Sequence, residues 1–312
     1  MMRIVTTIEE LYSEVPTAVA IGKFDGVHLG HRRLLASVVK ASAGGLLPCA
    51  FTFEPSPERF FGGSAQRILS TRDEKRQLLE AAGIGLLIEY PLNCESAAIA
   101  PEVFVREFLH RRLKAGRIVA GADLSFGAEG RGDFTLLNAM RPECGYETEE
   151  IEKLMIDGSP VSSSRIRRLV AKGAMEDAAL CLGNAYSLEG EVVHGAGRGK
   201  GFGFPTLNLI PAEEKLLPPF GVYLCNAYLF RKKWEGLCNI GMKPTVSSEQ
   251  RIGAETFLFG LDRDAYGEKL RLELLHYTRP ERKFEDISGL KKQLDADIQN
   301  AKELFGYMSE RI

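Results

Sequence analysis

Two histidines, His28 and His31, stand three residues apart where a glycine-rich loop leads into a helix-favouring segment. Residues three apart share one face of a helix, and the first helical turn carries backbone N–H groups that have no partner within the helix. Such a turn attracts anions. Because two imidazoles frame it, the turn indicates a nucleotide site rather than histidines that only cap or pack. We expect the residues around this turn to contact the nucleotide: Gly22, Phe24, Asp25 and Gly30.

A second candidate phosphate site begins at three consecutive serines, residues 162–164, which precede Arg165, Arg167 and Arg168. Serine favours the position just before a helix, so the arginines fall in the first helical turns. Positive charges there oppose the helix dipole, and a bound polyanion explains their presence best. A serine that simply caps the helix is the alternative.

Glycines are also frequent in the loop of residues 121–133, which contains Phe126. This composition can place an aromatic ring against a flat ligand while the backbone keeps its freedom.

The second half of the chain contains Thr206 and Asn208, which point the same way from an extended backbone. Their hydroxyl and amide oxygens are suited to Mg²⁺, a hard cation that takes oxygen ligands and keeps several waters. A threonine and an asparagine in a turn after proline are the plain alternative.

The adjoining segment of residues 194–201 is rich in glycine but is not a Walker A loop. His194 stands where that motif needs its leading glycine, and Gly201 stands where it needs serine or threonine. We interpret the segment as a basic flap whose amides, Gly195 among them, can wrap phosphates. A mobile loop without this role is the alternative.

Two kinds of element must position these residues. In the first half, apolar strands alternate with helices, which predicts a parallel sheet covered on both faces, with ligands at the carboxyl ends of the strands. The expected strands are Ala18–Ile21, Leu46–Phe53, Gly85–Tyr90, Arg117–Gly121 and Glu149–Ile156.

After residue 183, short β-rich runs separated by glycine and proline predict a small closed or nearly closed barrel. The apolar stripe of Asp286–Phe305 predicts a helix packed against that barrel. We therefore expect two domains, residues 1–183 and 184–312.

Bulk properties narrow the class of protein further. A length of 312 residues suits two domains, and a formal net charge of −2 gives no general attraction to nucleic acid or anionic membranes. The sequence has no apolar stretch of the length of a signal peptide or a membrane span, so we expect a cytoplasmic protein whose partners are small molecules. Nothing in the sequence decides whether the chain oligomerises, and a weak or transient oligomer is compatible with it.

These motifs together resemble the HxGH nucleotidyltransferases, and more closely the prokaryotic bifunctional riboflavin kinase/FMN adenylyltransferases, or FAD synthetases. The similar segments cover nearly the whole chain and occur in the order of that family: Gly22–His31, Thr52–Pro57, Gly121–Gly127, Val161–Arg167, Gly203–Leu209, Asn239–Thr245 and Arg279–Phe284. The resemblance implies a Rossmann-like α/β nucleotidyltransferase followed by a small β-barrel riboflavin kinase domain with a C-terminal helix. It also implies ATP as co-substrate, Mg²⁺, and riboflavin, FMN and FAD as substrates or products.

The resemblance assigns roles in the first domain. His28, His31 and Arg167 are expected to stabilise charge during adenylyl transfer. The family motif makes Ser163 and Ser164 ligands of the ATP phosphates. It also places Asp123 and Phe126 against the flavin.

In the second domain, the resemblance makes Glu255 the general base that takes a proton from the 5′-hydroxyl of riboflavin. An exposed carboxylate at a strand end is the plain alternative. Gly195 and Gly203 are expected to bind the nucleotide, and Thr206 and Asn208 to bind both the nucleotide and the metal.

The chain departs from the family pattern at Ser56, Ala122 and Ser125, where a histidine, an aromatic residue and a basic or aromatic residue are frequent. These departures concern the flavin contacts. They leave two alternatives open: adenylylation of FMN or another phosphate-bearing acceptor alone, and a flavin-binding regulatory or storage protein without turnover.

Overall fold

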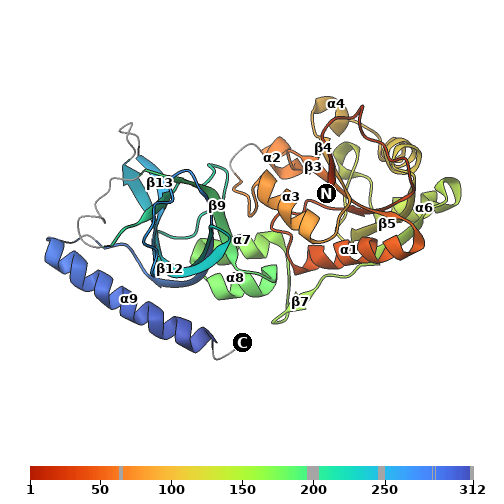
Figure 1. Cartoon of the computed structure of the whole chain (residues 1–312). Helices are drawn as coiled ribbons and strands as arrows, with labels where there is room; N and C mark the ends of the chain where they lie inside the picture. The colour runs from red at the N-terminus through yellow and green to blue at the C-terminus, as the bar shows by residue number, and fades with distance from the viewer. Residues whose placement is uncertain (63–65, 195–203, 245–249, 283, 285, 310–312) are drawn as a thin grey trace. The chain divides into compact units, whose positions relative to one another are not determined.

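The computed structural model describes residues 1–62, 66–194, 204–244, 250–282, 284 and 286–309. The chain forms two compact units, Met1–Arg165 and Ile166–Ile312 (Figure 1). The division falls within helix α7, Ser163–Lys172, which continues from the first unit into the second. The expected domain boundary between residues 183 and 184 stays a prediction.

The first unit is built on a six-stranded sheet whose described strand pairs are all parallel. Its order is β1-β4-β3-β2-β5-β6, so the chain crosses over between neighbouring strands as it does in Rossmann-like folds. The predicted fold class is confirmed for this unit. The strands are β1 Arg3–Val5, β2 Thr17–Ile21, β3 Leu47–Glu54, β4 Leu86–Pro91, β5 Ala115–Gly121 and β6 Glu147–Ile151.

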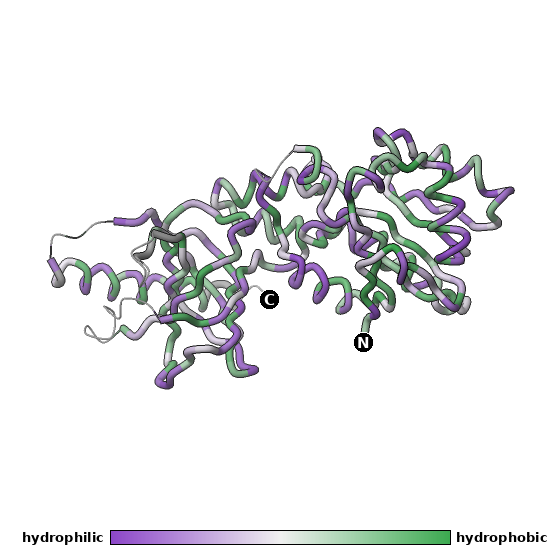
Figure 2. The backbone as a smooth tube through the Cα atoms, turned by 90° about the horizontal axis from the view of Figure 1, so that it is seen from above, coloured by the Kyte–Doolittle hydropathy of each residue, from purple (hydrophilic) through white to green (hydrophobic). Residues whose placement is uncertain are grey.

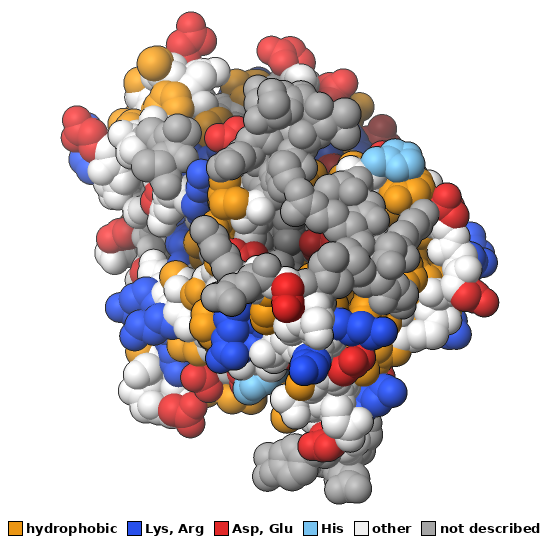
Figure 3. All heavy atoms as spheres, turned by 90° about the vertical axis from the view of Figure 1, so that its left-hand side faces the viewer, with side chains coloured by type: hydrophobic (Ala, Val, Ile, Leu, Met, Phe, Trp, Pro, Cys, Tyr) orange, Lys and Arg blue, Asp and Glu red, His pale blue; other side chains and the backbone are white. Residues whose placement is uncertain are grey.

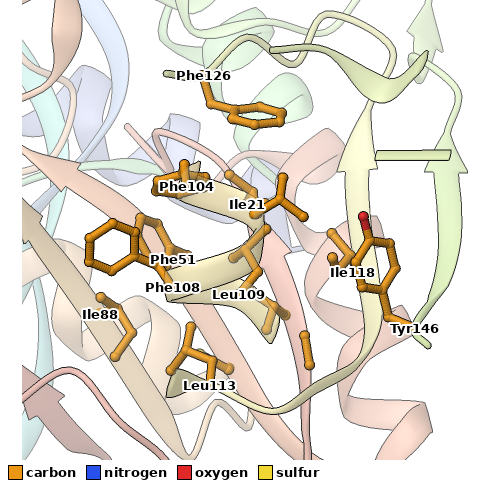
Figure 4. Packing of buried hydrophobic residues seen from close by; sticks show 14 of the residues in the cluster. Ile21, Phe51, Ile88, Phe104, Phe108, Leu109, Leu113, Ile118, Phe126 and Tyr146 are labelled. Carbon is orange, nitrogen blue, oxygen red and sulfur yellow. The ribbon is translucent and has the colours of Figure 1, made fainter. Parts of the chain in front are cut away.

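Helices cover both faces of this sheet. Alternate residues of β2 belong to different hydrophobic clusters, with Val19 in one and Ala20 in the other, because successive strand residues point to opposite faces. Figure 4 shows one cluster, where Phe51 from β3 lies close to Phe104 and Phe108. The helices are α1 Leu29–Lys40, η1 Ala41–Gly44, α2 Pro57–Gly62, α3 Arg72–Ala81, α4 Cys94–Ala97, α5 Pro101–Val103, η2 Phe104–Arg112, η3 Ala128–Gly130 and α6 Phe134–Cys144.

The expected strand Glu149–Ile156 is wrong in its extent. Strand β6 ends at Ile151, and β7, Met155–Ile156, instead forms a hairpin with β8, Ser159–Pro160. Asp157 and Gly158 both have positive φ, 51° and 71°, which is the backbone of a tight two-residue hairpin turn. The turn reverses the chain before α7.

The second unit contains a closed antiparallel barrel of order β10-β13-β12-β11-β14-β9. The predicted barrel is confirmed. Its strands are β9 Tyr186–Val193, β10 Leu207–Leu209, β11 Gly221–Leu229, β12 Lys232–Pro244, β13 Gln250–Leu258 and β14 Lys269–Arg279. Helix α8, Met175–Leu182, precedes the barrel.

The predicted C-terminal helix is present as α9, Ile287–Ser309. It is amphipathic, with hydrophilic and hydrophobic residues alternating along its length (Figure 2). Ala301 and Phe305 pack on the outer face of the barrel against three residues, Val222, Leu224 and Leu237. An ion pair between Arg279 and the buried carboxylate of Asp297, 2.6 Å, also joins α9 to β14.

The surface carries both signs of charge. On the face shown in Figure 3, acidic and basic side chains are interspersed among the described residues, as the small net charge suggests. Each described helix is either too short or too polar to cross a lipid bilayer.

Candidate functional site

The structure brings His28 and His31 together at the start of α1. His28 is the N-cap residue, and its Nδ1 accepts a hydrogen bond from the backbone N–H of His31 at 3.3 Å. The two rings stack with centroids 3.7 Å apart and planes 15° apart. Because Nδ1 of His28 is an acceptor, its neutral ring carries the proton on Nε2. The helix cap therefore leaves that N–H free to act as a donor, and capping and ligand binding are compatible.

Burial decides the charge of both rings. His28 is 6 % exposed, and burial lowers its pKa to about 4, although Asp123 opposes the shift. The pKa of His31 is lowered well below its usual value by burial and by the nearby His28 and Lys23. Its Nδ1 is buried and has no hydrogen-bond partner among the described residues. Both rings are thus neutral near pH 7, and a bound phosphate would favour their protonation.

The loop before α1 is held by its own hydrogen bonds. The Asp25 carboxylate accepts from the backbone N–H groups of Leu69 and Ser70, at 2.9 and 3.0 Å. Ser163 Oγ donates to the backbone oxygen of Asp25 at 3.0 Å. Phe24 is fully buried, and a Cβ at Gly22 would lie 3.1 Å from its ring. These residues shape the loop that presents the histidines, and their predicted contacts with a nucleotide stay predictions.

The start of α7 is tied to the preceding hairpin. Arg165 Nη1 donates to the backbone oxygens of Ile156 and Ser159, at 2.9 and 2.8 Å. Arg165 therefore anchors the hairpin to the start of α7. Ser164 and Arg167 lie on the same helix, and their assignment to ATP phosphates stays a prediction.

The loop of residues 121–133 is tied down at two points. Phe126 and Gly132 exchange backbone hydrogen bonds of 2.9 Å, and the Phe126 ring packs into the core at 5.3 Å from Phe104 (Figure 4). Asp123 pairs with Lys153 at 3.2 Å. Contacts of Phe126 and Asp123 with a flavin stay predictions, and the Phe126 side chain is buried.

A second group of polar residues gathers in the barrel. Thr206 Oγ1 donates to Glu255 Oε1 at 2.8 Å, although the two residues are 49 positions apart. Asn208 lies directly opposite Glu255 across β10 and β13. Asn239 lies directly opposite Glu255 on the other side, across β13 and β12. Directly opposite residues share one face of a sheet, so Asn208, Glu255 and Asn239 form one row.

Sequence reasoning gave Asn239 no role. Asn239 lies in the segment Asn239–Thr245, which resembles the family. Its place beside Glu255 follows from the register between β12 and β13, which is set only when the barrel closes. Gly195 and Gly203, expected to bind the nucleotide, lie outside the described residues.

The side-chain oxygens of Thr206 and Asn208 suit a hard cation. The described residues include no cluster of three or more His, Cys, Asp or Glu side chains that could hold a metal. Thr206 donates its hydroxyl hydrogen bond to Glu255, which leaves the oxygen lone pairs of the hydroxyl available, and Asn208 adds an amide oxygen. Such neutral oxygens fit Mg²⁺ that also keeps waters and phosphate oxygens.

Comparisons with known proteins agree with this architecture. The family model described as FAD synthetase matches residues 12–165, and the model described as riboflavin kinase matches residues 182–305. A bifunctional riboflavin kinase/FMN adenylyltransferase from Listeria monocytogenes is 30 % identical over 98 % of this chain and 97 % of its own length. The protein of that name from Escherichia coli K12 is 32 % identical over 98 % of both chains.

A solved structure has the same fold. The crystal structure named as a macrolide-efflux protein from Streptococcus pneumoniae superposes with a TM-score of 0.87 and 25 % identity, covering 96 % of this chain and 99 % of that one. Both family models match in order along one chain, and the two relatives align over nearly its whole length. This chain belongs to the family of bifunctional riboflavin kinase/FMN adenylyltransferases.

Proposed function

We propose that this chain phosphorylates riboflavin to FMN with ATP and then adenylylates FMN to FAD with a second ATP, releasing pyrophosphate. The observation that carries the proposal is the presence, in order on one chain, of both family models. We place the boundary between the two activities after Gly183, whose positive φ of 78° ends α8 just before the first barrel strand.

The adenylylation requires little acid–base catalysis by the first unit. The phosphate of FMN is largely ionised near neutral pH and can attack the α-phosphorus of ATP without a strong base. Catalysis then consists of alignment and of donors aimed at the charge that develops. We assign that role to His28, His31 and Arg167. The Nε2–H of His28 is a donor held in place by the cap hydrogen bond.

Other residues of the first unit complete this proposal. We assign Ser163 and Ser164 to the ATP phosphates, and the turn of Gly22, Phe24, Asp25 and Gly30 to the nucleotide. A Cβ at Gly30 would lie 3.1 Å from the His28 ring, so a glycine there keeps the space above that ring open. Asp123 and Phe126 are assigned to the flavin.

The phosphorylation needs a base, because a protonated alcohol is a poor nucleophile. We propose that Glu255 accepts the proton of the riboflavin 5′-hydroxyl. The hydrogen bond from Thr206 fixes the direction of its carboxylate. The ATP phosphates would be held by the segment that contains Gly195 and Gly203.

The residues present fit a magnesium ion, with Thr206 and Asn208 as its protein ligands. When bound, Mg²⁺ neutralises charge on the ATP phosphates. Thr206 would serve both the ion and Glu255, which couples the position of the base to the position of the nucleotide. We further propose a cytoplasmic enzyme that works on small molecules without a nucleic-acid or membrane partner.

The test is an incubation of the purified chain with ATP, Mg²⁺ and riboflavin, with the products resolved by chromatography. Formation of FMN followed by FAD is the expected result. FAD from added FMN but no product from riboflavin would support adenylylation alone. Binding of flavin without conversion would support a regulatory or storage protein and contradict the proposal.

A further inference from the structure

The amide oxygen of Asn239 is buried and has no hydrogen-bond partner among the described residues, although it lies in the row beside Glu255. A buried acceptor without a partner is costly, and its usual explanation is a donor that arrives with a ligand or water. Glu255 cannot supply that donor, because an ionised carboxylate only accepts. A donor on the ligand that Glu255 serves would supply the missing partner.

A hydrogen bond to Glu281 sets the orientation of the Asn239 amide. Its Nδ2 donates to Glu281 Oε1 at 3.0 Å. A carboxylate only accepts, so the amide nitrogen faces Glu281 and the oxygen is the atom left without a partner. Gly241 makes room for this arrangement, since a Cβ there would lie 2.1 Å from the same Glu281 oxygen.

The spacing of the row suits a chain that carries several hydroxyl groups. Neighbouring strands lie about 4.8 Å apart, so Glu255 and Asn239 present two acceptors side by side. A substrate with one terminal hydroxyl and further hydroxyls on its chain can donate to both at once. A substrate with the terminal hydroxyl alone satisfies only Glu255.

We propose that Asn239 is a specificity-determining residue for the alcohol acceptor. Its oxygen accepts a hydrogen bond from a secondary hydroxyl of the polyol chain while Glu255 takes the proton of the terminal hydroxyl. Glu281 is a positioning residue that holds the amide of Asn239 in this orientation. The inference rests on the proposed phosphorylation of riboflavin and adds to it the recognition of a secondary hydroxyl of the ribityl chain.

The experiment compares two acceptors, riboflavin and a flavin whose five-carbon chain carries only the terminal hydroxyl. The kinase kcat/KM is measured for both with the wild-type chain and with Asn239→Ala. The wild type should prefer riboflavin by about tenfold, the worth of one good hydrogen bond to a buried acceptor. Asn239→Ala should lose that preference, chiefly through a higher KM for riboflavin.

Further variants separate specificity from folding. Asn239→Leu keeps the branched shape of the side chain without its polar atoms and should behave like Asn239→Ala. Glu281→Gln keeps an acceptor for Nδ2 and should keep the preference, whereas Glu281→Ala should weaken it. Asn226 is the matched control: its amide oxygen is also buried without a partner among the described residues, yet it lies opposite Glu235, four positions from Asn239 along β12. Asn226→Ala should leave the preference unchanged.

The outcomes distinguish this inference from the proposed function. Equal use of the two acceptors by the wild type, or an unchanged preference in both Asn239 variants, would overturn the role of Asn239 and leave the riboflavin kinase standing. Failure of the wild type to phosphorylate either acceptor would contradict the kinase itself. Thermal unfolding of each variant shows whether the barrel is intact.

Discussion

The imidazole ring of His28 lies flat against that of His31, with centroids 3.7 Å apart, while its Nδ1 caps the helix that both residues begin. Two cationic rings so close together would repel each other, and burial opposes charge on each. The pair is therefore neutral in the free protein, and a bound anion would favour its protonation.

Stability of the first unit should fall in mild acid. Burial lowers the pKa of His28 from 6.5 to about 4. Between these two values the unfolded chain binds a proton at His28 that the folded chain does not bind. The free energy of unfolding is therefore unaffected by His28 above about pH 6.5. It decreases as the pH falls toward 4, by up to roughly 3 kcal/mol. Urea unfolding at several pH values measures it, and His28→Gln should flatten the dependence. An equally steep loss in that variant would contradict the assignment.

ATP binding to the first unit should take up protons near pH 6, because the triphosphate raises the pKa of the two histidines. Titration calorimetry in buffers of different ionisation heat measures the uptake directly. Glu255→Gln leaves the histidines untouched and serves as the background, so that its uptake should equal that of the wild type. His31→Gln should reduce the uptake. Heats that do not depend on the buffer would exclude protonation of the pair.

His31→Ala should slow adenylylation of FMN by about 10²- to 10³-fold, the usual cost of removing one donor to a developing charge. Phosphorylation of riboflavin should continue, because Glu255 belongs to the other compact unit. Both rates are obtained from one chromatographic assay with FMN or riboflavin as the starting flavin. Unchanged adenylylation in a folded His31→Ala protein would remove His31 from the catalytic site.

Glu255→Gln should lower riboflavin phosphorylation by about 10²- to 10⁴-fold, the range expected for loss of a general base. The glutamine oxygen can still accept from Thr206, so the local geometry is kept and only the basicity is lost. Adenylylation of added FMN should be spared. Glu235→Gln, an exposed carboxylate on β12, is the control that should change neither rate. Loss of both activities in Glu255→Gln would argue against two separate sites.

Asp297→Ala should destabilise the barrel by about 3 kcal/mol, because it leaves the Arg279 guanidinium largely buried without its partner carboxylate. Denaturant unfolding followed by the fluorescence of Trp234 in the second unit measures the loss. Glu143→Ala removes an exposed ion pair with Arg106 in the first unit and should change little. A similar small effect in Asp297→Ala would show that apolar packing alone holds α9.

Some features of this protein were readable from the sequence because they are local. The His28 and His31 pair depends on a spacing of three residues and a helix start, and both are properties of one short segment. The capping box of Thr71 and Glu74 at the start of α3 is equally local, because it joins residues three positions apart. The alternation of strands and helices in the first half predicted the parallel sheet, and the succession of short strands in the second half predicted the barrel. Both patterns depend on which faces of the elements are buried.

Other features were decided only by the tertiary structure. Asn239 stands beside Glu255 because closure of the barrel sets β12 next to β13 in a particular register. Periodicity tells which face a residue occupies but not which residue from another strand lies next to it. Phe126, whose contact with a flavin stays a prediction, packs on Phe104 because its loop is closed by a backbone pairing with Gly132. The sequence thus indicated the types of residue that could do the chemistry. Which residues lie next to them in space depended on long-range strand register and packing.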